Sequence, residues 1–171
     1  DAFYSLQARC LLHFRQPQQA LKALKQLHDI SSEQSTYLFL TCYRALGDAQ
    51  NLIKTLTSIE NWHTQKRILG ILNEFVSYLQ DKKDPLTAAT VLMSFPNWAS
   101  NESTLMQVAG LYIEAAKALP KTCMQHMTLL QFSLDTYMRI PDFRTRQDVL
   151  SKLAPLHFMM GDYVNTLGAY L

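Results

Sequence analysis

The sequence predicts an all-α fold in which about five antiparallel helical hairpins stack as an α-solenoid. Apolar residues make up 48% of the chain and charged residues only 18%, and five Gly and six Pro leave most of it free to be helical. Apolar residues recur mostly at intervals of three and four, which favours helices over strands. The same spacing also occurs twice, as Tyr4, Ala8, Leu11, Ala20 and as Leu150, Ala154, His157, Thr166. Such recurrence indicates a stacked array.

The first two predicted hairpins cover about residues 1–28 and 33–59. In the first, Pro17 is suited to the opening position of the second helix, where its missing N–H costs nothing. In the second, Gly47 is suited to the left-handed conformation that ends a helix, and Asp48 to the N-cap of the next one.

The other three predicted hairpins cover about residues 63–95, 101–140 and 143–171. Asp84 and Pro85 together predict a helix start. A helix over 143–160 would contain Pro155, which predicts a kink or a one-turn break. No linker is long enough to divide the chain. We therefore expect one domain over 1–171, cut at both ends from a longer array.

The hairpin spacing resembles the tetratricopeptide-repeat family in a divergent form. That family places a large residue at position 4, small residues at 8 and 20 and bulky residues at 11 and 24, with a Gly-Asp-Tyr-like turn between its two helices. Gly161-Asp162-Tyr163 matches the turn, whereas Leu40 and Val76 replace the small residue at position 8. The resemblance implies a right-handed solenoid. The segment from Tyr37 through Asp48 also resembles the degenerate repeats of the meiotic crossover scaffold family.

In this family, positions 2, 5, 9 and 12 of each first helix face a concave groove. The candidate partner-binding residues are Arg9, Tyr37, Thr41, Arg44, Asn73 and Ser77. Arginine pairs bidentately with carboxylates, so these residues suit an extended acidic peptide. Family members that hold a chaperone's terminal carboxylate have Lys at position 5 and Asn at position 9. Ser5 and Arg9 stand there in this chain, so that role is not implied.

The net charge of +2 and the scattered Lys and Arg residues do not favour nucleic acid as a partner. No apolar run approaches the ~18 residues of a membrane span, so no membrane partner is expected. Cys10, Cys42 and Cys123 are odd in number and widely spaced, which argues against disulfides and zinc. The expected location is intracellular, in the cytoplasm or the nucleus.

No catalytic, metal-binding or cofactor-binding motif is present, so we expect no enzyme activity, no metal and no cofactor. Trp62 and Trp98 are expected to plug joints between repeats rather than anchor a partner. The seven methionines are expected to fill the core.

The predicted function is a non-enzymatic scaffold segment of a larger helical-repeat protein, which binds protein partners and neighbouring repeats of its own chain. One alternative is an RNA-binding array of helical hairpins. Another is a structural spacer in a subunit of a larger enzyme complex.

Overall fold

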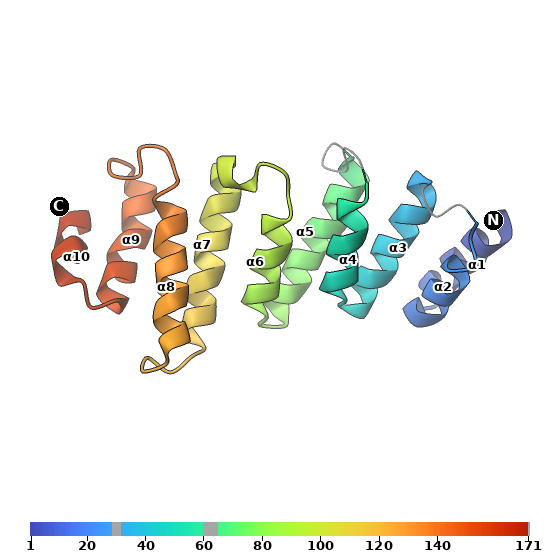
Figure 1. Ribbon diagram of the computed structural model, residues 1–171, viewed down its shortest axis with the longest axis horizontal. Coiled ribbons are helices and arrows are strands. Elements are labelled where there is room, and N and C mark those ends of the chain that lie inside the picture. Colours follow the sequence, from blue (N-terminus) through green and yellow to red (C-terminus); the bar gives the residue numbers. More distant parts are fainter. Residues whose placement is uncertain (29–31, 60–64, 171) are drawn as a thin grey trace. The chain divides into compact units, whose positions relative to one another are not determined.

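The computed structural model describes residues 1–28, 32–59 and 65–170, and every regular element in these ranges is helical (Figure 1). The predicted all-α class is therefore confirmed. The chain comprises two compact units, Asp1–Asp81 and Lys82–Leu171, each of which is described by itself. The boundary falls in the polar segment between two helices. In the described ranges, no helix has both the length and the apolar character needed to cross a membrane.

The described residues of unit 1 form five helices, and each of them packs against at least one other. They are α1 (Ala2–His13), α2 (Pro17–Leu24), α3 (Glu33–Leu46), α4 (Ala49–Thr57) and α5 (Lys66–Asp81). Helix α2 packs against both α1 and α3, and α3 also contacts α1, α4 and α5. Alanines and leucines of α1 and α2 join Leu38, Phe39 and Cys42 of α3 in one buried cluster. Small residues in this cluster let the helices approach closely.

In unit 2, too, helices that follow one another along the chain pack against each other. Its elements are α6 (Pro85–Met93), the short 3-10 helix η2 (Trp98–Ser100), α7 (Glu102–Lys117), α8 (Met124–Tyr137), α9 (Gln147–Met159) and α10 (Tyr163–Tyr170). Helix α7 contacts α6 and α8, and α9 contacts α8 and α10. The core joins α7, α8 and α9 through residues that include Leu105, Leu130 and Leu156.

One turn geometry recurs at four places that share a position in the sequence register. The residues at these places have left-handed backbones, namely Arg15 (φ 57°), Gly47 (φ 72°), Lys83 (φ 59°) and Gly161 (φ 77°). At three of them the amide of the next residue donates to the carbonyl oxygen five residues before it: Gln16 to Leu11 (2.8 Å), Asp48 to Tyr43 (2.9 Å) and Asp162 to His157 (2.9 Å). These bonds satisfy carbonyls that the helix end would leave unpaired.

The residue after the left-handed position lies directly before the first residue of the next helix. Asp48 and Asp84 accept hydrogen bonds from the amides of Asn51 (3.1 Å) and Thr87 (3.2 Å). Asp162 accepts from the amide of Asn165 (3.2 Å) and from its side-chain amide (2.6 Å), and these bonds lower the pKa of the Asp162 carboxyl. Gln16 makes no such side-chain cap.

Positions 8 and 20 of the register are buried in each matched repeat. Position 8 holds Ala8, Leu40, Val76 and Ala154, and position 20 holds Ala20, Leu52, Ala88 and Thr166. None of these residues is more than 9% exposed. The register deduced from sequence therefore selects interior positions even where the small residue is replaced.

The predicted start of the helix over residues 143–160 was wrong. The helix begins at Gln147, because the left-handed Asp142 (φ 54°) holds the preceding segment in turns. Arg146 then binds both Glu102 (2.5 Å) and Asp148 (2.7 Å), which ties the start of α9 to α7. The helix runs through Pro155 without a one-turn break, so of the two predicted outcomes only the kink stays a prediction. Pro155 is exposed, so the carbonyl that loses its helical partner lies on a face that water can reach.

Two other expectations concern large side chains. Trp98 is half-buried against the core of unit 2, with the guanidinium of Arg139 5.7 Å from its ring centroid, and its role in a joint between repeats stays a prediction. Trp62 lies outside the described residues. The core-filling role was wrong for Met124 and Met127 of α8 and for Met138 directly after it, because these side chains are exposed.

Candidate functional site

A polar hollow of about 360 Å³ lies in unit 1, where side chains from three helices meet. Arg9 from α1, Glu33, Gln34 and Tyr37 from α3, and Gln65, Arg67 and Ile68 at the start of α5 line it. Two of the predicted residues, Arg9 and Tyr37, therefore lie on one surface. The same surface includes Arg67, which the sequence argument did not select.

Local structure accounts for the positions of these side chains. Ser32 caps α3 by accepting a hydrogen bond from the amide of Ser35 (3.2 Å), so Glu33 and Gln34 form its first turn. Glu33 also complements the positive end of the helix dipole. Arg67 lies in the first turn of α5, beside Ile68, which is buried.

The hollow offers more positive than negative charge. Its lining holds the guanidinium groups of Arg9 and Arg67 and one carboxylate, that of Glu33. Within the described ranges, neither arginine forms an ion pair with an acidic side chain. The Oε1 atom of Gln65 is buried there without a hydrogen-bond partner in the described chain. The surface thus presents two guanidinium groups, each of which can donate hydrogen bonds to a carboxylate.

The other predicted residues have different surroundings. Arg44 of α3 forms an ion pair with Glu74 of α5, so its charge already has a partner inside unit 1. The hydroxyl of Thr41 donates to the backbone carbonyl of Tyr37 (2.8 Å). Asn73 and Ser77 are exposed on α5. None of these four residues lines the hollow that holds Arg9 and Tyr37.

Arg67 was missed because it precedes the first position of its repeat in the register. A signal was nevertheless present, since Lys66-Arg67 is one of the two densest basic pairs in the chain. Its meeting with Arg9 depends on how α5 packs against α3, which local spacing does not specify.

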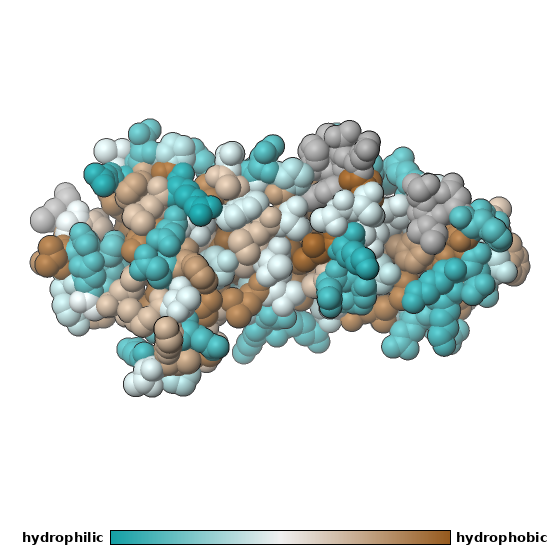
Figure 2. Space-filling view, in the orientation of Figure 1, coloured by the Kyte–Doolittle hydropathy of each residue, from teal (hydrophilic) through white to brown (hydrophobic). Residues whose placement is uncertain are grey.

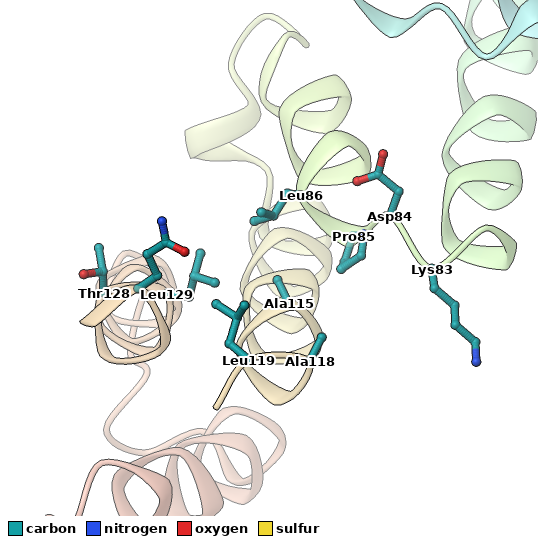
Figure 3. A pocket seen from close by; sticks show the side chains of 10 residues that line it. Lys83, Asp84, Pro85, Leu86, Ala115, Ala118, Leu119, Thr128 and Leu129 are labelled. Carbon is teal, nitrogen blue, oxygen red and sulfur yellow. The ribbon is translucent and has the colours of Figure 1, made fainter. Parts of the chain in front are cut away.

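A second hollow, of about 490 Å³, lies in unit 2 and is mainly apolar. The N-terminal end of α6 contributes Pro85 and Leu86, and α7 and α8 contribute residues that include Ala115, Leu119 and Leu129. In Figure 3 the leucine side chains border this space, whereas Lys83 points away from it. The hollow offers apolar contact and few hydrogen-bonding groups.

Buried polar groups of unit 2 are used in packing. Nδ1 of His126 lies 2.8 Å from the carbonyl oxygen of Ala116, and the Ser133 hydroxyl donates to the carbonyl of Ala109 (2.9 Å). Both contacts join α8 to α7. The described parts of both units contain no group of three or more His, Cys, Asp or Glu residues that could hold a metal ion.

Comparisons with models of protein families, with curated proteins and with solved structures find no match to this chain.

Proposed function

We propose that this chain is a non-enzymatic scaffold segment that binds an extended acidic segment of a protein partner in the polar hollow of unit 1. The observation that carries the proposal is the meeting of Arg9, Tyr37 and Arg67, from three different helices, on one surface. Carboxylates of the partner pair with the two guanidinium groups, and the half-exposed ring of Tyr37 packs against its chain.

An extended peptide suits this surface better than a small anion does. A peptide brings several carboxylates along one chain, so that the guanidinium groups of Arg9 and Arg67 can each pair with one of them. Glu33 repels a carboxylate on its own side of the hollow, which favours acidic residues placed next to the arginines.

We also propose that the helices belong to a right-handed α-solenoid of the tetratricopeptide type. Support comes from the left-handed residue that recurs at Arg15, Gly47, Lys83 and Gly161, and from the buried residues at positions 8 and 20 of the register. Solenoids of helical hairpins present extended surfaces for binding, which agrees with an interaction role.

The test uses a short labelled peptide in which Glu alternates with Ser, and a second peptide with Gln in place of Glu. Fluorescence anisotropy should show that the 171-residue chain binds the Glu peptide and not the Gln peptide. The Arg9→Ala/Arg67→Ala variant should bind more weakly, by about 1.5–3 kcal/mol for each charge-assisted hydrogen bond lost. The affinity should also fall as salt is added.

The matched control is Lys22→Ala/Lys25→Ala, which removes two exposed charges, one in α2 and one directly after it, and leaves the hollow intact. It should keep most of the affinity. Equal weakening by the two double variants would mean that net charge alone attracts the peptide, and would overturn the proposed site. Tighter binding of single-stranded RNA than of the Glu peptide, lost with the same two arginines, would favour the RNA-binding alternative.

A further inference from the structure

A third hollow, of about 520 Å³, lies in unit 2 along helix α9. Figure 1 shows α9 between α8 and α10, and both of these helices contribute residues to the lining. Leu134 of α8 and Leu150 and Leu153 of α9 give the hollow an apolar floor. Figure 2 shows apolar and hydrophilic surface close together over α8 and α9. The hollow is therefore a groove with helical walls, which we call the α9 groove.

The two ends of the α9 groove carry opposite charges. Arg144 lies before the N-terminal end of α9, and Asp162 follows its C-terminal end. The lining residues of α9 are Leu150, Leu153 and His157, whose spacing of three and four residues places them on one face of the helix. From the first to the last they cover about 10 Å. An apolar floor thus separates a cationic end from an anionic end.

At the cationic end, the guanidinium group of Arg144 is available to a carboxylate. Arg144 is exposed, and its guanidinium carbon lies 5.6 Å from the ring centroid of Phe143, which also lines the groove. Within the described ranges, Arg144 forms no ion pair with an acidic side chain. Contact with an aromatic ring leaves the N–H groups of a guanidinium free to donate hydrogen bonds.

At the anionic end, the carboxylate of Asp162 keeps its charge. Its side chain is 39% exposed, and it accepts hydrogen bonds from the backbone and side-chain amides of Asn165, which are neutral donors that lower the pKa of the carboxyl. Nδ1 of His157 lies 3.4 Å from Oδ2 of Asp162. His157 occupies position 11 of the register, where the other matched repeats have leucine or tyrosine. This end of the groove is therefore polar where those repeats are not.

We propose that the α9 groove binds an amphipathic helix of a protein partner, with an acidic residue facing Arg144, a basic residue facing Asp162 and apolar residues between them. Residues seven positions apart in a helix lie on one face about 10 Å from each other, which matches the length of the floor. An apolar groove between two helices suits a helical occupant. A purely acidic segment is disfavoured, because one of its carboxylates would meet Asp162. No residue of the polar hollow in unit 1 takes part, so this proposal does not depend on acidic-peptide binding.

Fluorescence anisotropy with short labelled helical peptides tests the proposal. Each peptide has leucines on one face and a charged residue on either side of them, with the two charges seven positions apart. One peptide carries Glu and Lys, a second carries Glu at both positions and a third carries Lys at both. The 171-residue chain should bind the Glu/Lys peptide about three- to tenfold more tightly than the other two, because each of those replaces one attraction with a repulsion.

Two variants should change this order of affinities in different ways. Arg144→Gln removes the cationic end, so the Lys/Lys peptide should bind as well as the Glu/Lys peptide. Asp162→Asn removes the anionic charge but keeps a residue that caps helices well, so the Glu/Glu peptide should bind as well as the Glu/Lys peptide. The matched control is Lys152→Gln, at an exposed site of α9 outside the groove, and it should leave the order unchanged.

An order that stays the same in both variants would overturn the proposal, as would a folded chain that binds none of the three peptides. Equal binding of a Glu/Lys peptide with proline between its leucines would also overturn it, because proline breaks the helix. Self-association of the chain that excludes the peptide would do the same, since the occupant would then be a second copy. The Arg9→Ala/Arg67→Ala variant should bind the Glu/Lys peptide as the wild type does, so failure of this proposal is distinguishable from failure of the site in unit 1.

Discussion

The turns after α1 and after α3 have the same backbone geometry and different residues. Both contain a left-handed residue, Arg15 in the first and Gly47 in the second, and in both the following amide donates to the carbonyl five residues before it. Asp48 caps the helix after the second turn with its side chain, whereas Gln16 forms no side-chain cap in the first. The geometry is therefore common to both turns, although only one of them has residues that favour it locally.

This difference indicates that packing holds the first turn in place. A non-glycine residue in the left-handed region costs about 1–2 kcal/mol, and neighbouring contacts must offset that cost. Ala8 and Ala20 are fully buried on the two sides of the first turn, as are Leu40 and Leu52 around the second. The buried positions are thus shared by both repeats, whereas the turn residues vary.

The largest losses of stability are expected from exchanging the residues at position 8, which is buried in both repeats. Leu40→Ala should cost about 2–5 kcal/mol, because it leaves a cavity at a fully buried site. The reverse change, Ala8→Leu, should overpack the α1–α2 crossing and cost about 1–3 kcal/mol, and Ala154→Leu should act similarly in unit 2. Denaturant unfolding measures all three losses. Ala45→Leu, at an exposed site of α3, is the control, and losses no larger than its own would mean that the repeat register is wrong.

The next largest effect is expected at the left-handed glycines. Gly47→Ala should destabilise unit 1 by about 1–2 kcal/mol, because the added Cβ makes φ 72° unfavourable. Steric overlap does not contribute, since that Cβ would lie at 3.7 Å from the ring of Tyr78, an ordinary contact.

The control is Gly70→Ala in the interior of α5, where an added Cβ meets nothing within 4 Å. Because alanine has a higher helix propensity than glycine, Gly70→Ala should stabilise the protein by about 0.5–1 kcal/mol. Thermal unfolding should therefore show opposite signs for the two glycine variants, and a shared sign would contradict the geometry of the second turn.

The helix caps should differ by a smaller amount. Asp48→Ala removes the acceptor for the amide of Asn51 and should cost about 1 kcal/mol. Gln16→Asp should gain up to about 1 kcal/mol, because it creates the Asp-Pro start that Asp84 and Pro85 already form before α6. Urea midpoints measure both changes. Loss of stability in Gln16→Asp would show that the two turns are not equivalent.

The smallest expected change is a gain at Arg15. Arg15→Gly removes the left-handed cost of about 1–2 kcal/mol but adds chain entropy to the unfolded state, so the net gain should be about 0.5–1 kcal/mol. The control is Lys22→Gly, which places glycine inside an ordinary helix and should destabilise the protein. Arg139→Gly is not a suitable control, because it would also remove the contact of that guanidinium with Trp98. Destabilisation in both variants would exclude a left-handed Arg15.

Sequence predicts the second turn well and the first only in part. Gly47-Asp48 carries its own local signal for a helix end and a new start, and Pro17 marks the helix after the first turn. The left-handed conformation of Arg15 has no such signal, because tertiary packing imposes it. Asp142 is also left-handed, and the helix that follows it begins at Gln147 rather than at the predicted residue 143.

The residues of the candidate site were likewise predicted from the sequence only in part. Arg9 and Tyr37 follow from the repeat register, and the structure brings them onto one surface. Arg67 and the ion pair of Arg44 with Glu74 depend on how α5 packs against α3, so periodicity within single helices could not predict them. Whether any of these residues binds a partner stays a prediction.

Charge reversal in the hollow tests the proposed function most directly. The Arg9→Glu/Arg67→Glu variant places two new carboxylates beside Glu33, so its preference between peptides should invert. In anisotropy titrations, the wild-type chain should bind the Glu peptide and the variant should instead bind a Lys peptide of equal length. Retention of the Glu peptide by the folded variant, with no gain for the Lys peptide, would contradict binding of an acidic partner at this site.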